Sequence, residues 1–333
     1  MSERLEMNRE NKQTISYIIP CYNCKNTLES VIEELKLIMM TLKQYTYEII
    51  LVNDYSVDGT YALIKRLCYE NMNLIGIDLS KNFGQHAALM AGFHYVTGEI
   101  IVCLDDDGQM PLEAVPQLIN AIDNGADAVF GEYNKERNIS LRELGSIVNA
   151  KMCEYLLDQP RNIQLTSFCA YKRFVVDEMI KYQNAYPYIA GLLLRTTKNI
   201  ENIPVNHRKR VASTSGYTLK KLLSLWMNGF TAFSVKPLRF ATCCGVICSL
   251  IGGIYAIITI IRKVVNPEIL VGYSSIITIL LFVGGMIMLM LGIVGEYIGR
   301  IYICINNSPQ YVIKEVISKR VDLTVLESDR IYE

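Results

Sequence analysis

The chain has 333 residues, enough for one α/β domain of ordinary size together with further elements. Its 33 lysines and arginines balance 33 aspartates and glutamates, so the formal net charge is zero. A nucleic-acid-binding protein gains most of its affinity from a concentrated basic surface, and the balance argues against that class.

The N-terminal half predicts alternating strands and helices. Short β-branched runs alternate with amphipathic stretches from Thr14 to about Asp127. The predicted strands span residues 15–20, 47–53, 74–79, 99–105 and 127–131, and the predicted helices span 28–43, 61–69, 86–95 and 112–123. Pro111 suits the first turn of the last of these helices. This alternation predicts a mostly parallel sheet with helices on both faces.

The end of the fourth predicted strand carries the most informative residues, because ligands bind at the carboxyl ends of strands in open α/β sheets. Asp105, Asp106 and Asp107 follow one another there, with Gln109 two residues on. Three consecutive carboxylates repel one another unless a cation lies among them. Oxygen ligands at alternate positions, Asp105, Asp107 and Gln109, suit a hard cation such as Mg²⁺ or Mn²⁺ that also holds diphosphate oxygens. The alternative is a solvated acidic turn.

Two further strand ends carry polar residues. Asp54, after the second strand, is expected either to be a turn or N-cap residue or to point into the same crevice and accept a hydrogen bond from the base of a nucleotide. Asp58 is expected to act as a turn or N-cap residue. Cys21 and Cys24, after the first strand, have the spacing of a redox motif. Nothing else in the sequence supports that alternative, and the ten cysteines show no zinc-site spacing.

The C-terminal half predicts a membrane anchor. Residues 240–261 carry no charge, and a second apolar run spans 269–295. Each is long enough to cross a hydrocarbon core of about 30 Å at about 1.5 Å per residue, which predicts a hairpin rather than a buried helix pair. The preceding segment has apolar residues at helical spacing, and it is expected to lie in the membrane interface or, alternatively, to face a protein core.

The charge pattern predicts the orientation of this hairpin. The connecting loop carries only Arg262 and Lys263, whereas more basic residues flank the outer ends. These are Lys220, Lys221, Lys236 and Arg239 before the hairpin, and Arg300, Lys314, Lys319 and Arg320 after it. The positive-inside rule then places both flanks and the N-terminal domain in the cytoplasm. The polar start of the chain, MSERLEMNRENK, predicts no signal peptide, in agreement with that location.

The chain resembles the inverting family 2 glycosyltransferases, in particular the bacterial undecaprenyl-phosphate aminoarabinose and glucosyl transferases, with dolichol-phosphate mannose synthase as a more distant relative. The resemblance runs through IIPCYN, LVNDYSVDGT, NFGQHAALMAGF, VTGEIIVCLDDDGQMP, HRKRVASTSGYTLKKLL, SVKPLR and GEYIGRIY and covers nearly the whole chain. It implies transfer of a sugar from a nucleotide-sugar, a UDP-sugar by likeness, to a polyprenyl phosphate, giving a lipid-linked sugar for modification of cell-envelope glycans. It also implies an Mg²⁺ or Mn²⁺ cofactor, a cell-membrane location and, since some relatives are tetramers, a homo-oligomer.

The resemblance implies a fold and a domain layout. The fold is a GT-A nucleotide-sugar domain, which is Rossmann-like, followed by a transmembrane hairpin. The expected layout is a polar tail at 1–13, the catalytic domain at 14–215, an interfacial helix at 216–239, the hairpin at 240–295 with helices at 240–261 and 270–295, and a cytoplasmic segment at 296–333.

The resemblance also assigns roles to matching residues. The nucleotide-sugar contacts are expected at Pro20, Tyr22, Asn23, Asp54, Lys81, Asp105 and Asp106. Asp105, Asp107 and Arg210 are the expected catalytic residues, with Asp107 and Gln109 nearest the metal. Arg142 and Ser146 match an Arg-x-x-x-Ser element that would hold the lipid phosphate, and Arg137 joins them. Arg210, Ser215 and Tyr217 match an element near the diphosphate, and the last two are also candidate contacts for the acceptor phosphate.

Several positions depart from the family pattern. Cys24 and Lys25 stand where an acidic residue is usual, Asn53 replaces an aspartate, and Ser213 replaces a glycine. Ser167 and Cys169 stand where many relatives have an acidic residue and an arginine. These departures do not change the expected reaction class. They do not allow the transferred sugar, or a protein residue that acts as a base, to be assigned.

Three other functions are weighed against this one. A processive polysaccharide synthase would need several helices around a channel and a Gln-x-x-Arg-Trp motif, and the single tryptophan, Trp226, lacks that context. A catalytically silent membrane scaffold would not need the acidic cluster or Arg210. A transporter often carries charges within its spans, and neither apolar run has one.

Overall fold

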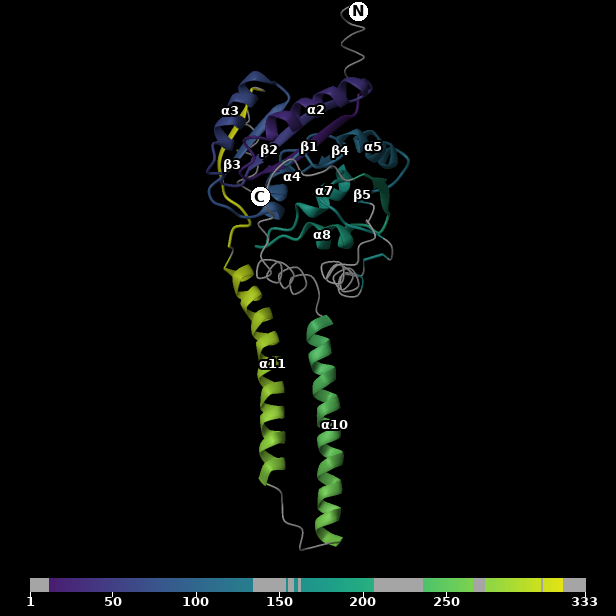
Figure 1. The fold of residues 1–333 in the computed structure, drawn as a ribbon, viewed down its shortest axis with the longest axis vertical. Coiled ribbons are helices and arrows are strands. Elements are labelled where there is room, and N and C mark those ends of the chain that lie inside the picture. The colour runs from purple at the N-terminus through teal and green to yellow at the C-terminus, as the bar shows by residue number, and fades with distance from the viewer. Residues whose placement is uncertain are drawn as a thin grey trace, which may run out of the picture. The chain divides into compact units, whose positions relative to one another are not determined.

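The computed structural model describes residues 12–133, 154, 159–160, 163–206, 236–265, 273–306 and 308–319. These residues belong to two compact units, an α/β unit and a unit of two long helices (Figure 1). The proposed interfacial helix at 216–239 lies almost entirely outside the described residues.

The first unit is built on a mixed sheet with the strand order β7-β5-β6-β4-β1-β2-β3-β8. The strands are β1 Thr14–Cys21, β2 Thr46–Asn53, β3 Leu74–Leu79, β4 Ile100–Cys103, β5 Ala128–Tyr133, β6 Cys169–Lys172, β7 Ile200–Val205 and β8 Ile313–Ser318. The pairs β4-β1, β1-β2, β2-β3 and β5-β7 are parallel, whereas β6 and β8 pair antiparallel with their neighbours. The prediction of a mostly parallel sheet is confirmed.

Helices cover both faces of this sheet. They are α2 Leu28–Thr41, α3 Thr60–Glu70, α4 Gln85–Phe93, α5 Val115–Asp123, α7 Arg173–Met179 and α8 Ile189–Thr196. Ile15, Tyr17 and Ile19 of β1 share one buried cluster with the apolar sides of α2, α3 and α5. The alternate residue Ile18 lies on the other face, where Gly92 of α4 packs against it. This alternation along β1 is the pattern of a strand that is buried on both faces.

Two predicted boundaries differ from the structure. The fourth strand was expected to reach Asp105, but β4 ends at Cys103, so Asp105 belongs to the turn that follows. The helix expected at 112–123 begins as a short 3₁₀ helix, Leu112–Ala114, and Pro116 rather than Pro111 occupies the first turn of α5. Proline is tolerated at both places because neither requires its missing N–H.

The C-terminal strand β8 was not predicted. It follows the second long helix in the sequence and pairs with β3 at the edge of the sheet. The α/β unit therefore contains residues from both ends of the chain, which the layout with a separate segment at 296–333 did not include.

Replacing Gly98 by alanine is expected to destabilise the α/β unit. A Cβ atom at Gly98 would lie 2.4 Å from the backbone oxygen of Thr14 and 2.8 Å from Ser16 Oγ. The backbone of β1 or of the 97–99 segment would have to shift, which costs about 2–3 kcal/mol and lowers Tm by roughly 5–10 °C. Thermal unfolding in detergent measures this, with Gly292→Ala as the matched control because no atom lies within 4 Å of a Cβ there. An unchanged Tm for Gly98→Ala would contradict the packing described.

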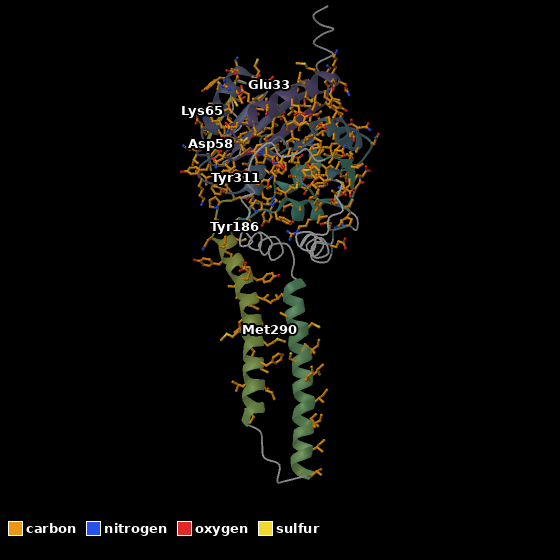
Figure 2. All side chains as sticks on the ribbon, in the orientation of Figure 1. Glu33, Asp58, Lys65, Tyr186, Met290 and Tyr311 are labelled. Carbon is orange, nitrogen blue, oxygen red and sulfur yellow. The ribbon has the colours of Figure 1, made fainter. Side chains whose placement is uncertain are left out.

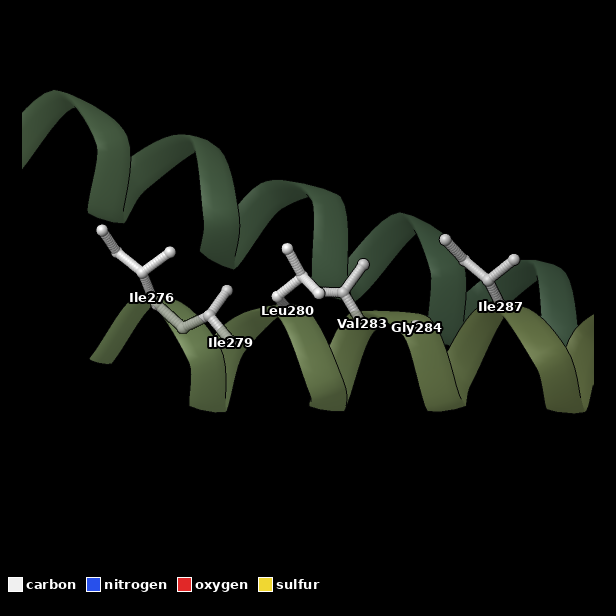
Figure 3. Close-up of a pocket in the computed structure, with 6 residues that line it drawn as sticks. All are labelled: Ile276, Ile279, Leu280, Val283, Gly284 and Ile287. Atoms are coloured by element: carbon white, nitrogen blue, oxygen red, sulfur yellow. The ribbon is translucent and has the colours of Figure 1, made fainter. Parts of the chain in front are cut away.

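The second unit consists of α10 Lys236–Val265 and α11 Tyr273–Ile305. Among the described residues, Phe282–Ile305 is long and apolar enough to cross a membrane, and Ala241–Gly252 is a shorter apolar stretch. A groove on α11 is lined only by Ile276, Ile279, Leu280, Val283, Gly284 and Ile287 (Figure 3). An apolar surface of this kind suits contact with lipid tails.

Candidate active site

The polar residues at the carboxyl ends of β1, β2 and β4 meet at one edge of the sheet. This follows from the topology, because β4, β1 and β2 are adjacent and parallel. Their loops are joined by side-chain hydrogen bonds, described below, and together they bring the acidic turn 105–109 next to Tyr22 and Asn23.

Asp105 is held from two sides. Its Oδ1 accepts a hydrogen bond from Gln85 Nε2 at 2.9 Å, and its Oδ2 accepts one from Ser167 Oγ at 2.6 Å. Burial raises the pKa of Asp105 to about 6, and the charges of Asp107 and Asp106 add to this rise while the two hydrogen bonds oppose it. The carboxylate is thus fixed in position by residues that lie far apart in the sequence.

Asp106 joins the acidic turn to the loop after β1. Its Oδ2 accepts the backbone N–H of Tyr22 at 2.9 Å, and its backbone oxygen accepts Thr27 Oγ1 at 2.6 Å. Burial raises its pKa, and the hydrogen bond from Tyr22 opposes that rise. The side chain of Asp106 therefore holds the backbone of Tyr22, a residue that is 53% exposed.

Asp107 and Gln109, the predicted metal pair, lie together in the structure. Asp107 Oδ1 accepts the backbone N–H of Gln109 at 3.0 Å, and its Oδ2 accepts the side-chain amide of Gln109. A rotation of the Gln109 amide by half a turn exchanges its O and N atoms. Its Oε1 would then lie on the side of Asp107 and could bind the same cation. The carboxylate and amide oxygens of this turn form a donor set that fits a hard divalent cation.

The loops after β1 and β2 are locked to each other. Asn23 N–H donates to Ser56 Oγ at 3.0 Å, and Asn23 Oδ1 accepts the N–H of Val57 at 2.9 Å. Asp58, labelled in Figure 2, accepts hydrogen bonds from Thr60 and from the N–H of Lys25. The prediction that Asp58 is a turn residue is confirmed, whereas the N-cap of α3 is Gly59, the residue after it.

Asp54 anchors the loop after β3. It is only 4% exposed, and its two oxygens accept the N–H groups of Phe83 and Gly84 at 2.7 and 2.8 Å. Gly84 has a φ of +90°, which favours glycine, and α4 starts at the next residue. Asp54 thereby fixes the start of α4, from which Gln85 reaches Asp105. A contact between Asp54 and a nucleotide base stays a prediction.

The remaining predicted residues fall into two groups. Pro20 is half-buried in β1, and Lys81 is exposed with its ammonium 4.9 Å from the centre of the Phe83 ring. Arg137, Arg142, Ser146, Arg210, Ser215 and Tyr217 lie outside the described residues.

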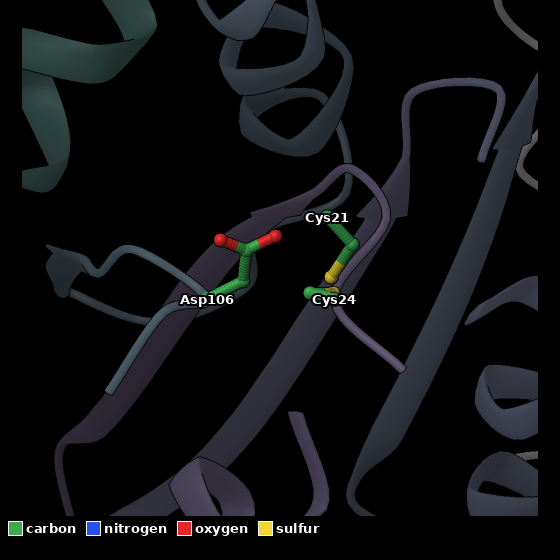
Figure 4. A group of neighbouring side chains, drawn as sticks. All are labelled: Cys21, Cys24 and Asp106. Atoms are coloured by element: carbon green, nitrogen blue, oxygen red, sulfur yellow. The ribbon is translucent and has the colours of Figure 1, made fainter. Parts of the chain in front are cut away.

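Cys21 and Cys24 lie near Asp106, as Figure 4 shows. The two thiols are 0% and 6% exposed, and Cys21 Sγ donates to the backbone oxygen of Ile19. Burial raises the pKa of Cys21 well above its usual range. Since the thiolate is the reactive form and the metal ligand, this environment gives no support to the redox alternative.

Sequence reasoning did not assign Gln85, Ser167 and His86 to this region. Gln85 and Ser167 both bind Asp105, and His86 packs edge-on against Tyr188 with 5.3 Å between ring centres. Burial lowers the pKa of His86 to about 4, so the imidazole is neutral at pH 7. The segment NFGQHAALMAGF, which holds Gln85 and His86, and the departure at Ser167 were the advance signals, but the partners of these residues are distant in sequence.

The chain is similar to several known proteins. CsbB of Bacillus subtilis, which is named as a glycosyltransferase, is 32% identical over 93% of this chain and 94% of its own length. The undecaprenyl-phosphate 4-deoxy-4-formamido-L-arabinose transferase of Yersinia enterocolitica is 32% identical over 92% of this chain and 95% of its own. The crystal structure of mannosyl-3-phosphoglycerate synthase from Rubrobacter xylanophilus shares the fold, with a TM-score of 0.53 at 15% identity over 70% of this chain and 76% of that one.

These relatives, together with the mostly parallel sheet and the acidic turn at its carboxyl edge, identify a glycosyltransferase with the GT-A fold. Residues 16–180 match Glycosyl transferase family 2, and residues 236–301 match the GtrB C-terminal hairpin. The chain belongs to glycosyl transferase family 2.

Proposed function

We propose that this enzyme transfers a sugar from a nucleotide-sugar, with UDP favoured as the nucleotide, to a polyprenyl phosphate. The acidic turn carries the proposal, because it gathers Asp105, Asp107 and Gln109 and is hydrogen-bonded through Asp106 to the exposed residue Tyr22. A relative named as an undecaprenyl-phosphate sugar transferase, alike over nearly its whole length, supports the acceptor. The apolar helix supports a reaction at a membrane, where such an acceptor is found.

Asp107 and Gln109 would hold Mg²⁺ or Mn²⁺, and the ion would stabilise the negative charge on the leaving diphosphate. Asp105, fixed by Gln85 and Ser167, would contribute to donor binding, and Tyr22 offers an exposed aromatic ring to the base. Arg210 would add positive charge near the diphosphate.

The acceptor needs little activation by a base. A phosphate monoester is ionised near neutral pH, so its oxygen can attack the anomeric carbon directly as the bond to the diphosphate breaks. This single in-line displacement inverts the anomeric configuration and leaves a nucleoside diphosphate. The main task of the protein is then alignment and charge stabilisation.

We place the hairpin across the cell membrane with both flanks and the catalytic domain in the cytoplasm. The basic residues outside the hairpin support this orientation. The lipid-linked sugar would serve modification of a cell-envelope glycan, and a homo-oligomer is proposed by family likeness.

A substrate panel tests the proposed function. The purified enzyme is incubated with Mn²⁺ or Mg²⁺, undecaprenyl phosphate and a series of radiolabelled UDP- and GDP-sugars. Label is expected to move into the lipid fraction with one donor far more than with the others. Nucleotide binding without transfer to any lipid phosphate would favour the catalytically silent scaffold instead.

Replacing Arg142 by alanine is expected to raise KM for undecaprenyl phosphate about tenfold or more while leaving nucleotide affinity within about twofold. A bidentate guanidinium contact to a phosphate is a strong charge-assisted interaction, and its loss falls on the acceptor alone. Transfer assays that vary each substrate in turn measure both effects, with Arg66→Ala as a control on the surface of α3. Equal weakening of both substrates would remove Arg142 from the acceptor site.

A further inference from the structure

The strand that follows the hairpin contacts the loop that leads to α4. The backbone oxygen of Val312 accepts the N–H of Ser80 at 2.9 Å, directly before the loop whose far end is bound by Asp54. Tyr311, labelled in Figure 2, hydrogen-bonds His94 Nδ1 at 2.9 Å. Gln310 Nε2 donates to the backbone oxygens of Tyr182 and Asn184. The segment 310–312 is thus attached at several points of the α/β unit.

The pairing of β8 with β3 is irregular next to Asp78. Asp78 lies opposite Glu315 and Leu79 lies opposite Ile313, so Lys314 is an extra residue at this point of the ladder. The ammonium of Lys314 lies 3.7 Å from Asp78 Oδ2. Because the Lys314 side chain is 68% exposed, this ion pair contributes little.

A chain of hydrogen bonds runs from Asp78 to the nucleotide-binding loops. Asp78 is 5% exposed, and its Oδ1 accepts Asn53 Nδ2 at 2.7 Å. Asn53 is 2% exposed, and its Oδ1 accepts the N–H of Ser56 at 3.2 Å. Ser56 Oγ accepts the N–H of Asn23, the residue after Tyr22. The first bond joins β3 to β2, the second lies within the turn after β2, and the third joins that turn to the loop after β1, so the position of one loop depends on the next.

The chemistry at position 53 is specific. An asparagine offers one amide to donate to Asp78 and one oxygen to accept from Ser56, and both are used. An aspartate there would place a second carboxylate within hydrogen-bond distance of Asp78, in a buried position where like charges repel strongly. The exposed Lys314 is too poorly placed to compensate for that repulsion.

We propose that Asp78 is a positioning residue for donor binding, which acts through Asn53 and Ser56 on the loops that hold the nucleotide. Together with the contacts of residues 310–312, it makes the strand after the hairpin part of the framework of the donor site. This inference rests on the proposed function, because it requires that these loops bind the nucleotide.

An exchange of the two side chains tests the proposal. Asn53→Asp is expected to weaken UDP binding and to raise KM for the nucleotide-sugar about tenfold or more, with a smaller change in kcat. In the double variant Asn53→Asp/Asp78→Asn, the amide at position 78 can donate to the carboxylate at position 53. That carboxylate can still accept the N–H of Ser56. The affinity for UDP should therefore return to within about threefold of the wild type. Asn124→Asp, at an exposed asparagine that follows α5, makes the same chemical change away from these loops, so it is the matched control and is expected to stay close to the wild type.

Binding is measured by calorimetry with UDP, and with GDP in parallel, in the presence of Mn²⁺ and below the Tm of each variant. A purely structural role would lower Tm and the active fraction without changing the dissociation constant, which would overturn the proposal. Failure of the double variant to regain affinity would also overturn it. If Asn53→Asp does not fold, Asp78→Ala, which leaves the amide of Asn53 unpaired, takes its place with the same expected loss of affinity. If the wild-type enzyme binds neither nucleotide, the proposed function itself is wrong.

Discussion

Replacing Asp107 by alanine is expected to abolish sugar transfer, with a loss of about 10³-fold or more in kcat. The side chains of Asp107 and Gln109 are hydrogen-bonded to each other in the acidic turn, and these two residues are the proposed ligands of the divalent ion. Removal of a group that stabilises charge in the transition state costs about 10²–10³-fold, and loss of the ion adds to this cost. Radiolabel transfer to undecaprenyl phosphate measures the effect.

The control for this variant is Glu33→Ala. Glu33 is an exposed carboxylate on α2 that pairs with Lys36, so its loss changes the charge equally without touching the acidic turn. Both variants should insert into membranes and unfold at temperatures close to that of the wild type. Full transfer activity in Asp107→Ala would reject the metal assignment.

Replacing Asp105 by asparagine is expected to inactivate the enzyme and, at the same time, to stabilise the metal-free protein at pH 8. Asp105 is half-buried next to Asp106 and Asp107, and burial raises its pKa from 3.8 to about 6. At pH 8 the folded protein therefore keeps a carboxylate charged in a place that disfavours the charge. An asparagine removes that charge but also the acidic oxygen needed for donor binding, so transfer should fall about 10²-fold or more.

The sign of the pH effect follows from the raised pKa. Between pH 3.8 and about 6 the folded state binds the proton of Asp105 more tightly than the unfolded state, so the contribution of this group to stability falls as the pH rises through that window. The Tm of Asp105→Asn should exceed that of the wild type by a few degrees at pH 8, and the difference should disappear near pH 4. Added Mn²⁺ should raise the Tm of the wild type more than that of the variant. A lower Tm at pH 8 for Asp105→Asn would contradict the account.

Local patterns explain why the acidic turn could be predicted. Asp105, Asp107 and Gln109 follow a run of buried residues, and the carboxyl ends of parallel strands meet at one edge of a sheet whatever the rest of the fold does. The pairing of Asp107 with Gln109 also follows from their spacing in a tight turn. These features depend on neighbours in the sequence, which a single chain displays directly.

Contacts between distant residues could not be predicted in this way. Gln85 and Ser167 are 20 and 62 positions away from Asp105, to which both donate a hydrogen bond. The residues around them in the sequence do not indicate this contact. The contacts of Asp54 with the N–H groups of Phe83 and Gly84, about 30 positions away, also had no local signal in the sequence. β8 lies beyond two apolar helices, so its hydrophobic alternation gave no sign of which sheet it joins.

The departure at Asn53 has a physical explanation that only the fold provides. The family resemblance implies an aspartate at position 53, and the structure places the asparagine that stands there against the buried carboxylate of Asp78. An amide can donate a hydrogen bond to Asp78 and accept one from Ser56 at the same time. The buried carboxylate of Asp78 therefore explains why an asparagine suits position 53.

The place of β8 in the sheet has a consequence for biosynthesis. The ribosome makes β8 after both long helices. While those helices are being synthesised, the backbone N–H and C=O groups on one side of β3 have no partner strand. The catalytic domain reaches its complete sheet only late in translation, after the hairpin has had the opportunity to enter the bilayer. A chain that is truncated before residue 313 would lack β8 and leave the edge of β3 unpaired. Such an exposed edge promotes aggregation and degradation.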